Sequence, residues 1–131
     1  MSDLVRVAVD AMGGDYAPVE PVKGAVEAVN ADERVKVQLV GQVDVIEKEL
    51  QKYTYPKERV EIVPATEIIE TGEPPVNAIR HKKDSSIVVG MKKVRCGEAD
   101  AFVSSGSTGA VLVGGQTIVC LLYTSPSPRD A

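Results

Sequence analysis

Two polar, glycine-containing turns are the parts of this sequence best suited to chemistry. The first, Asp10–Asp15, reads Asp-Ala-Met-Gly-Gly-Asp, and the second, Ser104–Gly109, reads Ser-Ser-Gly-Ser-Thr-Gly. Each follows an apolar run that suits a buried strand. A strand that ends at small residues and turns into a helix leaves backbone N–H groups without partners, and such groups bind anions. We therefore consider both turns as candidate anion sites.

The common nucleotide motifs do not account for these turns. The second turn contains Gly-x-x-Gly but lacks the Gly-x-Gly of a dinucleotide fingerprint, and neither turn ends in the Gly-Lys-Ser/Thr of a phosphate-binding P-loop. Simpler interpretations stay open for both. Gly13-Gly14 is compatible with an ordinary tight turn. Ser104–Gly109 is compatible with a capped helix start, although two hydroxyls and two glycines exceed what capping requires.

A basic segment lies between the two turns in the sequence. Residues 80–95 contain six Lys or Arg and one Asp, in a chain whose net charge is −4. Such a segment can dock an acidic partner or hold cations near a transferring phosphate. A solvated helix face is the simpler alternative. We expect His81 to be exposed rather than catalytic, and Cys96 to be a small core residue rather than a nucleophile.

Metal and triad chemistry find no support in the sequence. The His, Cys, Asp and Glu residues show no metal-ligand spacing, and a single histidine does not define a Ser-His-Asp triad. We therefore expect no metal and no cofactor.

The elements that would position these residues alternate along the chain. Apolar, β-branched runs predict buried parallel strands at Leu4–Asp10, 35–40, 60–63 and 101–103. Helices are expected from Pro18 to 30–32, from about Asp44, from Val76 to about Arg80, from an N-cap at 84–86 to a stop at Gly97, and after Gly109. Because strand and helix alternate with short connections, the sequence predicts a three-layer α/β domain with a largely parallel sheet. Ligands of such sheets bind outside the carboxyl ends of the strands, where both turns lie.

Composition limits the class of protein. At 131 residues the chain is long enough for one domain with a hydrophobic core. Apolar content of 44% and charged content of 26% are typical of soluble globular proteins, and no apolar run approaches the ~20 residues of a membrane span. The N-terminus lacks the apolar block of a signal peptide, and two cysteines indicate a reducing cytoplasm. The acidic balance argues against nucleic-acid binding.

Three segments together resemble the bacterial phosphate acyltransferase (PlsX) family. Their order and spacing agree with that family from Leu4 to about Val119. The departures are His81, where a basic residue is usual, Ser105 for Ala, and Ser107, where Asn is commonest. The three segments are Val7–Pro18 (Val-Ala-Val-Asp-Ala-Met-Gly-Gly-Asp-Tyr-Ala-Pro), Ala78–Ser86 (Ala-Ile-Arg-His-Lys-Lys-Asp-Ser-Ser) and Gly97–Ala110 (Gly-Glu-Ala-Asp-Ala-Phe-Val-Ser-Ser-Gly-Ser-Thr-Gly-Ala).

The resemblance implies a reaction, a fold and partners. Inorganic phosphate would displace acyl carrier protein from a long-chain acyl thioester, and the acyl-phosphate formed would feed phospholipid synthesis. The fold would be like that of isocitrate and isopropylmalate dehydrogenases, and the full-length protein would be a homodimer. It would be cytoplasmic and touch the membrane only through regions outside this chain.

The resemblance also assigns candidate roles to residues of this chain. Expected catalytic residues are Asp10, Lys82, Lys83, Asp84, Ser104, Ser107 and Thr108. Expected phosphate- or substrate-binding residues are Gly13, Gly14, Asp15, Ser85, Ser86, Gly106 and Gly109. Expected docking residues for the acidic carrier protein are Arg80, Lys92, Lys93 and Arg95.

The last residues are expected to differ from the rest. Residues 120–131 read Cys-Leu-Leu-Tyr-Thr-Ser-Pro-Ser-Pro-Arg-Asp-Ala, which looks like translated sequencing adaptor and predicts a disordered, non-native tail. A natural linker is the alternative. Residues 1–119 would then be the N-terminal part of the acyltransferase domain, inactive alone. The competing functions are a short-chain phosphate acetyl- or butyryltransferase and a non-catalytic module that binds acyl carrier protein.

Overall fold

A four-stranded, all-parallel sheet forms the centre of the protein. The computed structural model describes residues 4–14, 16–70, 72–106 and 108–115. The strands stand in the order β3-β2-β1-β4, and each neighbouring pair is parallel. Their bounds are β1 (Val5–Asp10), β2 (Val35–Gly41), β3 (Val60–Pro64) and β4 (Ala101–Val103).

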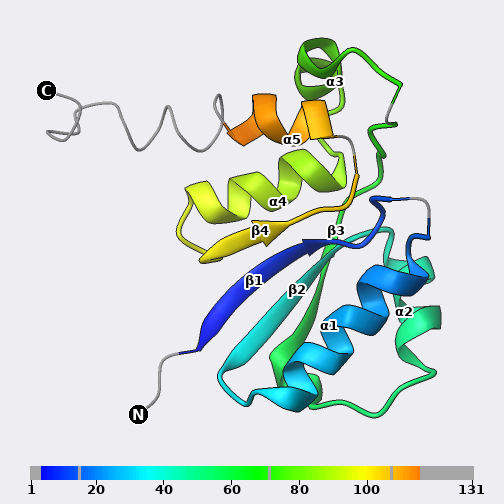
Figure 1. Cartoon of the computed structure of the whole chain (residues 1–131), viewed down its shortest axis with the longest axis vertical. Helices are drawn as coiled ribbons and strands as arrows, with labels where there is room; N and C mark the ends of the chain where they lie inside the picture. The colour runs from blue at the N-terminus through cyan, green and yellow to red at the C-terminus, as the bar shows by residue number, and fades with distance from the viewer. Residues whose placement is uncertain (1–3, 15, 71, 107, 116–131) are drawn as a thin grey trace, which may run out of the picture.

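Helices cover both faces of this sheet (Figure 1). On one face, α1 (Val19–Ala31) and α2 (Val43–Leu50) pack against β1, β2 and β3. On the other face, α4 (Ser86–Arg95) packs against β1, β2 and β4. Two shorter helices, α3 (Pro75–His81) and α5 (Thr108–Gly114), pack against α4, and a 3-10 turn, η1 (Lys57–Arg59), precedes β3.

The connections reverse direction at β1. From β1 the chain moves outward through α1 to β2 and through α2 to β3, and both helices lie on one face. It then returns through α3 and α4, on the other face, to place β4 on the free side of β1. Neighbouring strands whose connections leave toward opposite faces define a topological switch point, where open α/β sheets bind their ligands. Here those strands are β1 and β4.

Burial explains why these segments form these elements. In α1 the side chains at Val22, Ala25, Val26 and Val29 are buried, as expected from their helical spacing. In β2 the last five residues are all buried, because both faces of the strand are covered. Ser85 caps α4 by accepting a hydrogen bond from the Val88 backbone N–H at 3.2 Å.

The predicted α/β architecture is confirmed as a four-stranded parallel sheet flanked by helices. Predicted and observed boundaries differ by a residue or two, and Gly97 follows α4 with a φ of +78°, which suits the glycine stop expected there. The prediction for Cys96 is wrong. Its side chain is exposed, because the residue lies just beyond the last turn of α4 rather than on the apolar face of that helix.

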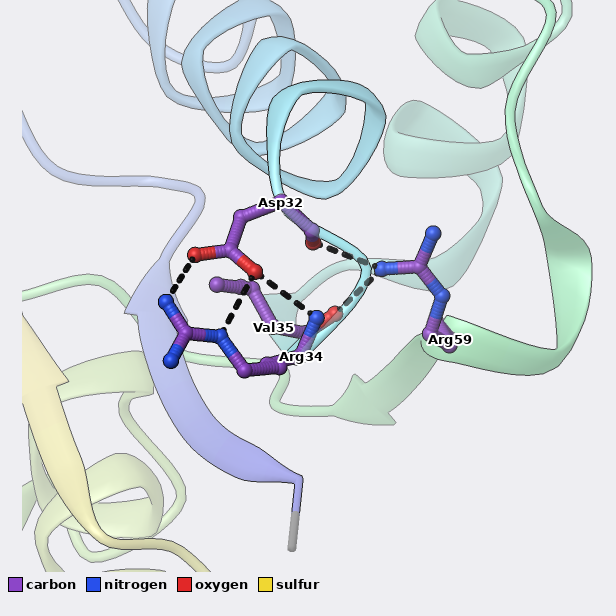
Figure 2. Close-up of polar contacts among 4 residues, drawn as sticks. All are labelled: Asp32, Arg34, Val35 and Arg59. Atoms are coloured by element: carbon purple, nitrogen blue, oxygen red, sulfur yellow. Dashed lines mark hydrogen bonds and ion pairs between the residues drawn. The ribbon is translucent and has the colours of Figure 1, made fainter. Parts of the chain in front are cut away.

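The amino-terminal end of β2 is closed by charged side chains (Figure 2). The guanidinium of Arg34 donates to both carboxylate oxygens of Asp32, at 3.2 and 3.1 Å. The guanidinium of Arg59 donates to three backbone carbonyls, those of Val29, Asp32 and Val35, each at 2.9 Å. These bonds join the end of α1, the start of β2 and η1.

Among the described residues, no helix combines the length and the apolar content that crossing a membrane requires.

Candidate functional site

Asp10 is the centre of the polar cluster at the switch point. It is the last residue of β1, and only 2% of its surface is exposed. Its Oδ1 accepts hydrogen bonds from the Ser86 hydroxyl at 2.5 Å and from the Met12 backbone N–H at 3.0 Å. Its Oδ2 accepts from the Ser104 hydroxyl at 2.7 Å. One buried carboxyl group therefore joins three segments that are far apart in the sequence.

Close backbone packing brings the two glycine-containing turns together. A Cβ atom on Gly13 would lie 2.4 Å from Asp10 Oδ2 and 2.8 Å from the backbone nitrogen of Gly106. Both distances are too short for a real side chain, so only glycine fits here. Gly14 has a φ of +93° and packs against Ser105. The predicted meeting of the two turns at one sheet edge is thus observed in the geometry.

Some backbone N–H groups at this meeting point have no acceptor among the described residues. The Gly106 N–H donates to the Ser104 hydroxyl oxygen at 3.0 Å. In the described part of the chain, the N–H groups of Gly13, Gly14 and Ser105 make no hydrogen bond. Donors without acceptors beside two flexible glycines can bind the oxygen atoms of an anion or a polarised carbonyl.

Ser85 and Ser86 support this cluster from the start of α4. Both are buried, and the backbone N–H of Ser86 donates to the Glu67 carbonyl at 3.2 Å. The Ser85 hydroxyl caps the helix, and the Ser86 hydroxyl donates to Asp10. The two serines expected to bind substrate therefore make their hydrogen bonds to the protein itself.

Asp84 holds the loop that follows β3. Its Oδ2 accepts from the backbone N–H of Thr66 at 3.0 Å and from the Thr66 hydroxyl at 2.6 Å. These hydrogen bonds, with a smaller contribution from the positive charge of Lys92, hold the pKa of the Asp84 carboxyl below its ordinary value. In return, the backbone N–H of Asp84 donates to a carboxylate oxygen of Glu67 at 3.1 Å.

Lys82 holds the far part of the same loop. Its Nζ donates to the Ile68 carbonyl at 2.7 Å and to the Glu73 carboxylate at 2.6 Å. The Lys82 ammonium, with a backbone N–H from Glu70, keeps the pKa of Glu73 below its ordinary value. The sequence did not predict that Thr66, Glu67 and Glu73 take part in holding this loop. The only signal for them was the polar character of the loop between β3 and α3.

The remaining cations of residues 80–95 divide into two groups. Lys93 forms an ion pair with Glu98 at 2.9 Å. The other four side chains are exposed, and no hydrogen bond or ion pair joins them to another described residue: Arg80, Lys83, Lys92 and Arg95. His81 is exposed, as expected.

Several predicted site residues are thus brought together and others are not. The residues within contact of one another at the switch point are Asp10, Gly13, Gly14, Ser86, Ser104 and Gly106. Gly109 instead lies where a Cβ would meet the Pro75 side chain at 2.5 Å, so it allows α5 to approach α3. Asp15, Ser107 and the side chain of Thr108 lie outside the described residues, as do residues 120–131. The roles of all these residues stay predictions.

A mostly apolar groove runs from the cluster along one face of the sheet. It encloses about 400 Å³ between α1 and strands β1 and β4. Its polar end is formed by Asp10, Gly13, Gly14, Ser104 and Ser105. No group of three or more His, Cys, Asp or Glu side chains in the described part of the chain is arranged to hold a metal ion.

Comparison with known proteins identifies relatives over nearly the whole chain. The model of a family described as fatty acid synthesis protein matches residues 5–126. A phosphate acyltransferase of Halothermothrix orenii is 48% identical over 127 residues, which are 97% of this chain and 38% of the relative. Those of Alkaliphilus oremlandii and Syntrophomonas wolfei are 49% and 51% identical, over 88% and 81% of this chain and 34% and 33% of theirs.

The chain spans about a third of the length of the curated relatives that it matches. Identity at this level, together with a family match over most of the chain, goes well beyond likeness in a single motif. The chain therefore belongs to the fatty acid synthesis protein family, together with these phosphate acyltransferases.

Proposed function

We propose that this chain is the amino-terminal part of an enzyme that transfers a long-chain acyl group reversibly from acyl carrier protein to inorganic phosphate. The acyl-phosphate formed would serve phospholipid synthesis. The observation that carries the proposal is the joining of the two glycine-containing turns through Asp10 at the switch point. The relatives named phosphate acyltransferase support the reaction class.

The reaction needs positioning and charge stabilisation more than a strong base. An oxygen of inorganic phosphate attacks the thioester carbonyl carbon and forms a C–O bond. The C–S bond then breaks, and the sulfur of the carrier protein leaves as a thiolate that takes up a proton. Charge develops on the carbonyl oxygen between these steps, and backbone N–H donors aimed at it lower the barrier.

The free N–H groups at the switch point suit this task. Those of Gly13 and Gly14 come from one turn, and that of Ser105 comes from the other. One turn can therefore hold a phosphate oxygen while the other holds the carbonyl oxygen, which places the two reactants side by side. Asp15, Ser107 and Thr108 would extend this surface, whereas Gly109 packs against Pro75.

Asp10 suits a positioning role better than that of a general base. Both of its carboxylate oxygens already accept hydrogen bonds, and the side chain is buried. It acts on the reaction by fixing Ser104 and the turn that follows. Ser86 acts in the same way, through Asp10.

The roles of Lys82, Asp84 and Ser85 in the reaction are then indirect. They fix the loop after β3 and the start of α4, from which Ser86 reaches the cluster. Lys83 lies in the same segment and is exposed, so it is the lysine of this pair that can meet a substrate phosphate or a carrier protein.

We further propose that exposed cations of residues 80–95 bind the acidic carrier protein. Among the described residues, Arg80, Lys83, Lys92 and Arg95 form no ion pair, whereas Lys93 is paired with Glu98. Charge complementarity of this kind speeds association and orients the partner. We also propose that the full-length protein is a cytoplasmic homodimer. Its fold would be like that of the isocitrate and isopropylmalate dehydrogenases, and it would touch the membrane only peripherally.

The reaction is tested in a full-length setting. The part of the Halothermothrix orenii phosphate acyltransferase that matches residues 4–119 is replaced by those residues of this chain, so that the predicted non-native tail is left out. The hybrid is expected to consume palmitoyl carrier protein only when inorganic phosphate is added, and to form acyl-phosphate that hydroxylamine traps. The 131-residue chain alone is expected to form none.

Three results would overturn the proposal. Consumption of acetyl-coenzyme A but not of palmitoyl carrier protein would assign a short-chain transferase. Carrier-protein binding without turnover by the folded hybrid would assign a binding module. Acyl-phosphate formation by the isolated chain would show that this part is complete by itself.

The docking surface is tested separately by charge reversal. Lys83→Glu with Lys92→Glu is expected to weaken carrier-protein binding at least tenfold at low salt. Lys48→Glu on α2, also an exposed lysine, is the matched control and is expected to change the affinity less than twofold. Equal affinity of the double variant and the control would contradict the assignment.

A further inference from the structure

The segment that follows β3 and the segment that begins α4 are joined by several hydrogen bonds. Two groups of Thr66 donate to Asp84 Oδ2, the backbone N–H at 3.0 Å and the hydroxyl at 2.6 Å. The backbone N–H of Glu67 donates to the Asp84 carbonyl at 3.1 Å, and the Glu67 carbonyl accepts from the Ser86 N–H at 3.2 Å. We call Thr66, Glu67 and Asp84–Ser86 the β3–α4 clamp.

Glu67 takes part in the clamp with its side chain as well as its backbone. Its Oε1 accepts a hydrogen bond from the Asp84 N–H at 3.1 Å, and the side chain is half-buried. The backbone bonds pair Glu67 with Ser85 in the manner of two parallel strands. Three polar groups of Glu67 therefore bind the same short segment, and that segment leads directly into α4.

The other side of the clamp is attached to the sheet. Ala65 is buried, and its N–H donates to the Gly41 carbonyl at 2.9 Å, which continues the pairing of β3 with β2. Connections between elements are commonly the more mobile parts of a fold. Here the first residues of the connection are bonded to β2 on one side and to the start of α4 on the other. The clamp therefore fixes the start of α4 relative to the sheet.

The start of α4 in turn determines where the Ser86 hydroxyl lies. Ser86 is the first residue of this helix, and its hydroxyl donates to Asp10 Oδ1 at 2.5 Å. A serine Oγ moves about one torsion only, so its position follows from that of the backbone. Asp10 holds the Ser104 hydroxyl through its other oxygen, at 2.7 Å. A displaced helix start would therefore disturb the turn at Ser104 through Asp10.

We propose that Glu67 is a positioning residue for the acyl transfer. By holding the start of α4, it keeps Ser86, Asp10 and the turn at Ser104 in the arrangement that binds the reactants. This inference rests on the proposed function, in which that turn is part of the site. Glu67 acts by accepting a hydrogen bond, so its oxygen matters and its charge does not. A general base in the same place would need the charge, which makes the two roles separable.

The test uses the hybrid enzyme that contains residues 4–119 of this chain. Glu67→Leu removes the accepting oxygen at similar volume, whereas Glu67→Gln keeps one oxygen and removes the charge. Glu47→Leu on α2 is the matched control, because Glu47 is exposed and forms no ion pair among the described residues. Consumption of palmitoyl carrier protein is measured over a range of phosphate concentrations.

Glu67→Leu is expected to lower kcat about tenfold and to raise the KM for phosphate at least about fivefold, because small misplacements of reactants are costly. Glu67→Gln should keep at least about half of the parent kcat, since its amide oxygen can accept the same bond. The control should stay within about twofold of the parent. KM does not depend on how much of the enzyme is folded, so its rise separates misplacement from partial unfolding.

Two kinetic results would overturn the positioning role. Equal losses in Glu67→Gln and Glu67→Leu would assign the role to the charge of Glu67. A lower kcat with an unchanged phosphate KM in Glu67→Leu would mean only that less of the enzyme is folded.

Hydrogen exchange gives a second readout that needs no acyl transfer. The Gly106 N–H donates to the Ser104 hydroxyl oxygen, so its exchange reports whether the turn is held. In Glu67→Leu, peptides that cover residues 101–106 should exchange this proton about tenfold faster than in the parent, whereas those of α2 should not change. Thr66→Val, with Thr66→Ser as its conservative partner, is the milder variant and should give a change of about threefold.

The two readouts separate failure of the inference from failure of the proposed function. Unchanged exchange at residues 101–106 in both Glu67→Leu and Thr66→Val would contradict the positioning role, whether or not the hybrid is active. A folded hybrid that transfers no acyl group to phosphate would contradict the proposed function instead.

Discussion

Asp10 and Asp32 are carboxyl groups at opposite ends of the sheet, and the protein holds them in opposite ways. Asp10, at the carboxyl end of β1, is buried, and its donors among the described residues are neutral groups, two hydroxyls and one backbone N–H. Asp32, just after α1, lies near the surface and is paired with the guanidinium of Arg34 (Figure 2). No ion pair in the described part of the chain includes Asp10.

The two ends of the sheet differ in which backbone polar groups lack a hydrogen-bond partner. At the amino end of β2, Arg59 covers three backbone carbonyls, so the end of α1 and the start of β2 are closed by the protein itself. At the carboxyl end, N–H groups of Gly13, Gly14 and Ser105 have no acceptor among the described residues. Closed polar groups stabilise a fold, whereas open ones next to a rigid support are available to a ligand. The closed amino end therefore stabilises the fold, whereas the open carboxyl end is the candidate site.

The largest expected effect follows from removing the Asp10 carboxyl group. Asp10→Ala removes the acceptor of the buried Ser86 hydroxyl and of the partly buried Ser104 hydroxyl and Met12 N–H. The expected loss is about 3 kcal/mol of unfolding free energy, from roughly 1 kcal/mol for each unsatisfied group. Urea unfolding followed by circular dichroism measures it.

Asp10→Asn is the matched control for that change. Its amide keeps the volume and one accepting oxygen, and a serine hydroxyl can rotate to accept from the new NH2 group. We expect Asp10→Asn to lose about half as much unfolding free energy as Asp10→Ala. If the unfolding free energies of both variants lie within about 0.5 kcal/mol of that of the parent, Asp10 does not hold the two turns together.

A smaller effect is expected at the closed end. Arg59→Met keeps much of the apolar stem of the side chain but removes three hydrogen bonds to backbone carbonyls. Because water can reach part of this surface, the expected loss is about 1 to 2 kcal/mol, below that of Asp10→Ala. Arg34→Met removes a surface ion pair and should lower the unfolding free energy less than Arg59→Met does. If Arg59→Met lowers the unfolding free energy more than Asp10→Ala does, the closed end contributes more to stability than the Asp10 cluster, contrary to our expectation.

Much of the fold could be predicted because its signals are local. Val22, Val26 and Val29 repeat at helical spacing, and the strands are apolar runs bounded by turns. The meeting of two turns followed from one general rule, that carboxyl ends of parallel strands share a sheet edge. That rule gives only the shared edge. The neighbourhood of β1 and β4, and with it the switch point between them, was not predicted and comes from the observed strand order.

The side-chain partners could not be predicted, because they depend on contacts between distant residues. Lys82 looked like its neighbour Lys83 in the sequence, yet Glu73 and the Ile68 carbonyl hold the first and not the second. Ser86 looked like a ligand-binding hydroxyl, yet it donates to a carboxyl group 76 positions away. The prediction that Cys96 is a core residue was wrong because its exposure depends on where α4 ends. The helix ends at Arg95, so Cys96 lies beyond its apolar face.

The smallest expected effect is a pH dependence at Asp32. Its hydrogen bonds and ion pair with Arg34 hold the pKa of Asp32 below its ordinary value. A carboxyl group whose pKa is lower in the folded than in the unfolded chain stabilises the fold above its unfolded pKa, near 3.9, and this contribution disappears as the pH falls through the folded value. Asp32→Asn should therefore lower the melting temperature slightly at pH 7, and the difference from the parent should shrink as the pH falls from about 5 to 3. Because the pair is at the surface, 1 M salt at pH 7 should shrink the difference too. A melting-temperature difference between parent and variant that widens on acidification would mean that Asp32 is not stabilised as a carboxylate. The contrast between a closed end held by an ion pair and an open end held by neutral donors would then fail at the closed end.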